Sequence, residues 1–76
     1  MTEMEYRQLF AKRIRQRINR LHIDQRELAR CADISEVTLS RYIQCRRKPT
    51  IDIVKKLAQA LECEVSDLID IDEVLE

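Results

Sequence analysis

The side chains of this sequence that could do chemistry gather between residues 24 and 49, and their chemistry is hydrogen bonding and ionic contact. Arg41 offers a planar fork of N–H donors, and Gln25 offers an amide that both donates and accepts. A run of three cations follows at positions 46–48. Such groups recognise polar partners and phosphates, but they make or break no covalent bond by themselves.

Carboxylates and cysteines do not form a catalytic or metal-binding pattern. Asp33 and Glu36 suggest paired carboxylates, but they fall on an exposed turn of a chain too small to enclose a large pocket. Cysteines at positions 31, 45 and 63 include no C-x-x-C pair, and with His22 they lack the close ligand spacing of a zinc site. We therefore expect no enzyme activity, no metal and no other cofactor.

The composition predicts one small domain with an unequal distribution of charge. Hydrophobic residues make up 45% and charged residues 37% of the 76 residues, which fits a globular domain and argues against disorder. Residues 1–50 hold 12 Lys/Arg against 6 Asp/Glu, whereas residues 51–76 hold 2 against 8. The net charge is zero, yet the local field of the basic part can steer a phosphate backbone. Because no signal peptide and no membrane-length apolar run is visible, we expect a cytoplasmic protein with free thiols.

N-cap residues predict where the helices that position these side chains begin. Thr2 and Asp24 each precede a glutamate by three residues, the pattern of a capping box, while Ser35 and Thr50 are favourable single caps. Apolar residues at helical spacing extend the helices over residues 3–21, 25–32 and 36–44, and from 51 onward, with a short fifth helix from about 66. We interpret the cations of the first helix, at positions 13 and 17 for example, as a solvated face.

The predicted third helix divides its residues between two sides. Leu39, Tyr42 and Ile43 face inward at positions i, i+3 and i+4. The opposite side holds Ser35, Glu36, Ser40 and Arg41. A helix with polar residues near its N-terminus, braced by a partner helix and followed by cations, has what is needed to enter a DNA major groove.

Four motifs together give the chain its resemblance to a known family. They are Gln25-x-x-Leu28-Ala29, the segment from Thr38 to Tyr42, the loop from Arg46 to Pro49, and Leu57-Ala58-x-Ala60-Leu61. With this joint spacing, residues 9–69 resemble the Cro and phage-repressor type of helix-turn-helix, the XRE family. The resemblance implies an all-α, compact five-helix, lambda-repressor-like DNA-binding domain. We expect residues 1–69 to form this helix-turn-helix domain and residues 70–76 to form an acidic C-terminal tail.

Three departures from the family pattern carry structural expectations. Asp33 replaces the glycine of the turn, and aspartate tolerates left-handed backbone better than most residues. Cys45 replaces a second glycine, so we expect strain or a shifted loop there. Ile18 and Ile43 occupy positions where many members place an Arg–Glu pair, and we expect these two side chains to pack on each other.

The resemblance also implies which residues contact DNA. The residues expected to contact bases are Ser35, Glu36, Val37, Ser40 and Arg41. The residues expected to contact phosphates are Gln25, Thr38, Arg46, Arg47 and Lys48. Within the first set, arginine suits guanine O6 and N7, glutamate a cytosine amino group, and valine a thymine methyl. The implied function is that of a sequence-specific transcriptional regulator of double-stranded DNA, and a repressor is favoured over an activator.

Two partner hypotheses remain at this point. One small domain has a small footprint, which favours a homodimer on an inverted repeat, with a contact between copies through apolar residues near the C-terminus, namely Ile69, Ile71, Val74 and Leu75. The alternative is a helical protein–protein interaction module that keeps the fold without specific DNA binding, which the zero net charge and the acidic tail favour. No membrane partner is expected.

Overall fold

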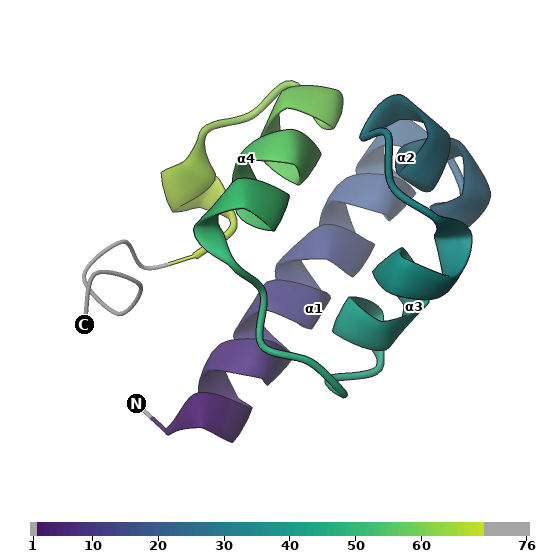
Figure 1. The fold of residues 1–76 in the computed structure, drawn as a ribbon. Helices are drawn as coiled ribbons and strands as arrows, with labels where there is room; N and C mark the ends of the chain where they lie inside the picture. The colour runs from purple at the N-terminus through teal and green to yellow at the C-terminus, as the bar shows by residue number, and fades with distance from the viewer. Residues whose placement is uncertain (1, 70–76) are drawn as a thin grey trace.

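Four α-helices and one 3-10 turn make up the part of the chain that the computed structural model describes, residues 2–69 (Figure 1). The elements are α1 (Glu3–Leu21), α2 (Gln25–Cys31), α3 (Glu36–Ile43), α4 (Ile51–Ala60) and the 3-10 turn η1 (Val65–Asp67). The long α1 runs diagonally through the molecule, with α2 and α3 on one side of it and α4 with η1 on the other (Figure 1). No strand occurs within residues 2–69, so the all-α prediction is confirmed.

All four α-helices begin at the predicted cap residues. The hydroxyls of Thr2, Ser35 and Thr50 accept the backbone N–H three residues on, at 3.1, 3.0 and 3.3 Å. The Asp24 carboxylate accepts the Glu27 N–H at 2.8 Å. Each of these bonds satisfies a backbone donor that the first helical turn leaves without a partner, which is why the starts of these helices are encoded locally.

Left-handed backbone follows all four helices, and none of the residues that adopt it is a glycine. The φ angles are 57° at His22, 57° at Asp33, 61° at Cys45 and 56° at Glu62. The turn at Asp33 thus uses the left-handed backbone that aspartate tolerates, and Cys45 stands in the strained conformation expected of a residue that replaces a glycine. A side chain with a Cβ in this conformation costs about 1 kcal/mol or more relative to glycine. Because the chain contains no glycine, each of the four positions lowers its stability by this amount.

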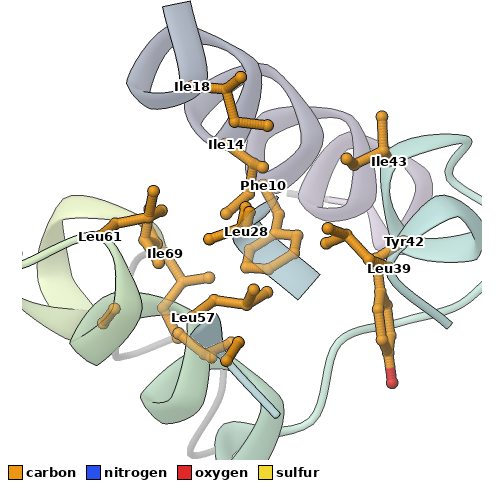
Figure 2. Packing of buried hydrophobic residues seen from close by; sticks show 14 of the residues in the cluster. Phe10, Ile14, Ile18, Leu28, Leu39, Tyr42, Ile43, Leu57, Leu61 and Ile69 are labelled. Carbon is orange, nitrogen blue, oxygen red and sulfur yellow. The ribbon is translucent and has the colours of Figure 1, made fainter. Parts of the chain in front are cut away.

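The hydrophobic core is assembled from side chains on α1, α2, α3 and α4 together with residues after η1. Figure 2 shows side chains from these elements converging around Phe10 and Leu28, both fully buried. The rings of Phe10 and Tyr42 meet edge to face, with centroids 6.4 Å apart and planes at 77°, which ties α1 to α3. The inward face predicted for the third helix is confirmed, since Leu39, Tyr42 and Ile43 are all buried.

The prediction of a fifth helix from about residue 66 is wrong for the residues that the structure describes. Val65–Asp67 make the single 3-10 turn η1 there. The N–H groups of Leu68 and Ile69 both donate to the Val65 carbonyl, at 3.0 and 3.1 Å, and the Asp67 carboxylate accepts the Glu64 N–H at 2.9 Å. One turn is enough to bury Leu68 and Ile69 in the core, so the spacing that suggested a helix is met without one.

The prediction that Ile69 contacts a second copy of the chain is wrong, because Ile69 is 1% exposed and belongs to the core cluster. Its side chain is therefore unavailable to a second copy. The other candidates, Ile71, Val74 and Leu75, lie outside the described residues. Ile18 and Ile43 are buried in the same cluster, and their direct contact stays a prediction.

None of the helices within residues 2–69 is long and apolar enough to cross a membrane.

Candidate nucleic-acid interface

The turn between α2 and α3 fixes the direction of the candidate recognition helix. The N–H of Asp33 donates to the Arg30 carbonyl at 3.2 Å, and the N–H of Ile34 donates to the Ala29 carbonyl at 3.0 Å. Left-handed Asp33 lets the chain reverse there, and Ile34 packs half-buried against the core. The start of α3 is thus held by hydrogen bonds and by apolar contact, so its outer face has a defined orientation.

The outer face of α3 borders an open hollow of about 500 Å³. Its lining residues come from α2, α3 and the loop after α3: Gln25, Glu36, Val37, Ser40, Arg41, Gln44 and Arg46. Val37 is 62% exposed, so its apolar surface faces the hollow without cover from other side chains of residues 2–69. Arg41 makes no salt bridge with any of residues 2–69, so its guanidinium is available to a ligand.

Six of the predicted site residues are brought together here, and four are not. The six are Gln25, Glu36, Val37, Ser40, Arg41 and Arg46, which all line the hollow. The other four, Ser35, Thr38, Arg47 and Lys48, lie outside its lining.

Ser35 and Thr38 are engaged with each other at the start of α3. The Ser35 hydroxyl accepts the Thr38 N–H at 3.0 Å and donates to the Thr38 hydroxyl at 2.7 Å. Because the hydroxyl proton of Ser35 is used within this pair, its capacity to donate to a base is reduced. The pair stabilises the end of α3 nearest the turn.

Gln44 also lines the hollow, although it is not among the residues predicted from the sequence to contact DNA. Its side-chain amide donates to the Ser40 hydroxyl at 3.0 Å, which leaves the carbonyl oxygen of the amide as an acceptor at the edge of the hollow. The sequence indicates this position, since residues four apart lie on one helix face and Gln44 follows Ser40, a predicted base-contacting residue, by four positions.

The basic loop after α3 is closed by backbone bonds and by contacts with α1. The N–H groups of Cys45 and Arg46 donate to the carbonyls of Tyr42 and Arg41, at 3.1 and 2.9 Å, which is the pattern of a helix C-terminus with a left-handed cap. The Lys48 ammonium lies 5.5 Å from the centroid of the Tyr6 ring. Burial raises the pKa of the Tyr6 phenol, so this ring remains neutral beneath the cation.

Three arginines of α1 contact other elements, and one of them is Arg17, so interpreting Arg17 as part of a solvated face is wrong. Arg17 is half-buried, with its guanidinium 3.7 Å from the Asp67 carboxylate of η1. Arg7 donates to the Cys45 carbonyl at 3.3 Å, and Arg15 donates to the Ile43 carbonyl at 3.5 Å. Two guanidiniums thus meet the C-terminal end of α3, where positive charge is favourable.

The cysteines are free thiols within the described chain, and the side chains of residues 2–69 bring no group of His, Cys, Asp and Glu together that could hold a metal ion. Burial is the main cause that raises the pKa of the Cys63 thiol. Arg17 opposes this shift, whereas Asp67 and Glu64 add to it. A thiol of this kind is a poor nucleophile, which fits a core position.

The comparisons with known proteins agree with this geometry. A family model described as a Cro/C1-type HTH DNA-binding domain matches residues 13–73. The P22 c2 repressor, solved in complex with a synthetic operator, is 30% identical with a TM-score of 0.73, and the match covers 83% of this chain and 96% of that one. No curated protein sequence matches the chain.

Two further solved structures share the fold. The restriction-modification controller protein C.AhdI from Aeromonas hydrophila has a TM-score of 0.78 at 22% identity, with 83% of this chain and 96% of that one covered. The clp gene regulator ClgR from C. glutamicum has a TM-score of 0.77 at 21% identity, with 92% and 88% covered.

Proposed function

The chain belongs to the Cro/C1-type helix-turn-helix DNA-binding family, and we propose that α3 recognises a specific operator in the major groove. The family and the fold are those of sequence-specific DNA-binding regulators, not of enzymes. The observation that carries the proposal is the hollow beside α3, where the side chains suited to base contact and the first cation of the loop lie together.

Each exposed side chain of α3 contacts a different chemical group of the bases. Arg41 contacts guanine O6 and N7, because its fork of donors matches those two acceptors. Val37 meets a thymine methyl with the apolar surface that it leaves exposed. Glu36 accepts from a cytosine amino group, and Ser40 contacts a base only together with Gln44, to which it is hydrogen-bonded. Ser35 contributes mainly by capping α3.

Phosphate contacts come from both sides of the hollow. Gln25 binds the backbone at the start of α2, and Arg46 and Arg47 bind it from the loop after α3, where all three side chains are exposed. Lys48 contributes from above the Tyr6 ring, and the Thr38 hydroxyl, which accepts from Ser35, keeps its own proton to donate to a phosphate. The protein-interaction alternative has less support, since a pure protein-binding module needs no such combination of amide, guanidinium and loop cations.

Repression by a homodimer on an inverted repeat is the form of regulation we propose. The P22 c2 relative is a repressor solved with an operator, and a single small domain covers too few base pairs for high specificity. The contact between copies would use apolar residues of the acidic tail, namely Ile71, Val74 and Leu75. We place this function in the cytoplasm, where free thiols remain reduced.

Selection from a random duplex library at near-physiological salt tests the proposal. The expected result is an enriched inverted repeat whose half-sites lie about 34 Å apart, together with a sedimentation mass of two chains per duplex. An enriched single half-site bound by one chain would contradict the dimer only. Weak, salt-sensitive retention without any enriched sequence would contradict operator recognition itself.

A further inference from the structure

The first two turns of α1 contact both ends of the segment Cys45–Lys48, which carries the loop cations. In Figure 1 the connection between α3 and α4 passes beside the N-terminal half of α1. Arg7 reaches the start of the segment through the Cys45 carbonyl, and Tyr6 lies under its end through the Lys48 ammonium. The exposed side chains of Arg46 and Arg47 lie between these two attachments.

We propose that Tyr6 and Arg7 are positioning residues for DNA binding, which hold this segment where Arg46 and Arg47 meet phosphates. The inference rests on the proposed function and deepens it. It assigns a part of the affinity to side chains that do not themselves touch DNA.

Arg7 is built to act as a brace. Its side chain is only 21% exposed, and its two terminal nitrogens reach in different directions, to the Glu3 carboxylate at 3.3 Å and to the Cys45 carbonyl at 3.3 Å. The planar guanidinium fixes the angle between these two bonds, which the single ammonium of a lysine cannot reproduce. The start of the segment Cys45–Lys48 is therefore held in a fixed position relative to α1.

Cys45 needs such a brace more than a glycine would. It stands in left-handed backbone, with φ at 61°, at the point where α3 ends and the segment begins. A β-carbon disfavours this conformation, so the loop keeps it only if the surroundings hold it there. The bond from Arg7 to the carbonyl of this same residue is a contact of that kind.

Tyr6 holds the other end by its ring face. The side chain is buried at the base of the loop, and the adjacent Pro49 is buried too, so the segment ends on a firm surface. The Lys48 ammonium lies above that ring. An aromatic face attracts a cation from a defined direction, and a leucine would keep an apolar side chain at this position without this attraction.

Arg20 supplies a matched control for Arg7. It lies on the same helix, is exposed, and makes no side-chain hydrogen bond or salt bridge within residues 2–69. The variants Arg7→Lys and Arg7→Met are compared with Arg20→Lys and Arg20→Met, and Tyr6→Leu is compared with Tyr6→Phe. Each full-length variant is titrated against the selected duplex and against a random-sequence duplex over a salt series.

The expected result is a loss of affinity that is the same for both duplexes. Arg7→Lys and Tyr6→Leu should weaken binding about three- to tenfold and lower the salt slope by about one, because one phosphate contact is lost. Arg20→Lys and Tyr6→Phe should bind as the wild type does. Since Arg7→Lys keeps the charge, its loss cannot come from net charge alone.

A second measurement follows the loop without DNA. The Arg46 N–H donates to the Arg41 carbonyl at 2.9 Å, so its hydrogen exchange reports whether the loop end is held. Arg7→Lys should accelerate exchange at Arg46 while amides in the middle of α4 keep their rates. Uniform acceleration across the chain, or binding equal to that of the Arg20 variants, would overturn the proposal.

The two proposals fail in different ways. If the wild type binds both duplexes equally weakly, operator recognition fails, and the exchange rate at Arg46 still decides whether Arg7 holds the loop. If the wild type selects an operator and Arg7→Lys binds it unchanged, only the positioning role fails. If Arg7→Met does not fold, Arg7→Lys and Tyr6→Leu still decide the matter.

Discussion

At the scale of single residues, specificity is expected to rest on Arg41 more than on any other side chain of α3. Its guanidinium borders the hollow and forms no salt bridge with residues 2–69. Ser40, by contrast, offers only one hydroxyl, which already accepts a hydrogen bond from the Gln44 amide, and the Ser35 hydroxyl already donates its proton to Thr38. A side chain with uncommitted donors can exchange water for a base at lower cost than one that must first break an internal bond.

Replacing Arg41 by alanine should therefore cost about 1–3 kcal/mol of binding and relax the preference at one base pair. The measurement is a titration against the operator and against its single-base variants. Arg46→Ala is the control, since loss of a phosphate contact weakens all duplexes alike. An equal loss on every duplex for Arg41→Ala would move this residue to the phosphate-contacting class.

At the scale of elements, the helices begin with favourable caps and end in unfavourable ones. Four N-caps are hydrogen-bonded as the sequence predicted, whereas four left-handed C-terminal positions are filled by residues with a Cβ. Glu62 is the clearest case for a test, because it is exposed and lies far along the chain from the α2–α3 hollow. The left-handed residues at the C-terminal ends of the helices thus lower the stability of the fold, whereas the hydrogen-bonded N-caps raise it.

Glu62→Gly should raise the free energy of unfolding by up to about 1 kcal/mol, because glycine accepts left-handed backbone without steric cost. This corresponds to a rise in Tm of about 4–8 °C for a domain of this size. Thermal unfolding followed by circular dichroism is the measurement. Glu62→Gln, which removes the charge and keeps the Cβ, should show no such gain, and equal Tm values for the two variants would contradict the backbone explanation.

At the scale of the whole molecule, the buried phenol of Tyr6 and the half-buried thiol of Cys63 make stability depend on alkaline pH. Burial raises the pKa of Tyr6 above its ordinary 10.0 and that of Cys63 above its ordinary 9.0. Both groups are neutral when protonated, so the folded state binds these protons more tightly than the unfolded state does. Their contribution is complete below pH 9.0 for the thiol and 10.0 for the phenol, and it is lost as pH rises through the raised values.

Stability should therefore fall as the pH rises above 9.0, and that of the double variant Tyr6→Phe, Cys63→Ser should fall less steeply. Urea unfolding at a series of pH values measures both slopes. Other groups that titrate in this range are common to the two proteins, so the difference in slope isolates the two buried groups. Parallel curves would show that neither side chain contributes to the alkaline loss.

Local features of this protein could be predicted from its sequence. The start of every α-helix, the left-handed turn at Asp33 and the inward face of α3 depend on residues three or four positions apart, so a linear pattern contains them. The grouping of Gln25 with the outer face of α3 was also predicted, although through resemblance to a family. These features follow from backbone hydrogen bonding and helical periodicity, which act over short stretches of chain.

Features that depend on long-range distance were decided only by the tertiary structure. Arg7 and Arg15 reach carbonyls at the end of α3, and Ile69 enters the core after a single 3-10 turn in place of a helix. Periodicity cannot distinguish an arginine that meets a distant carbonyl from one that meets water, because both lie outside the apolar stripe. That choice is made by the packing of α1 against α3, where the carbonyls at the C-terminal end of α3 attract the nearest guanidinium groups.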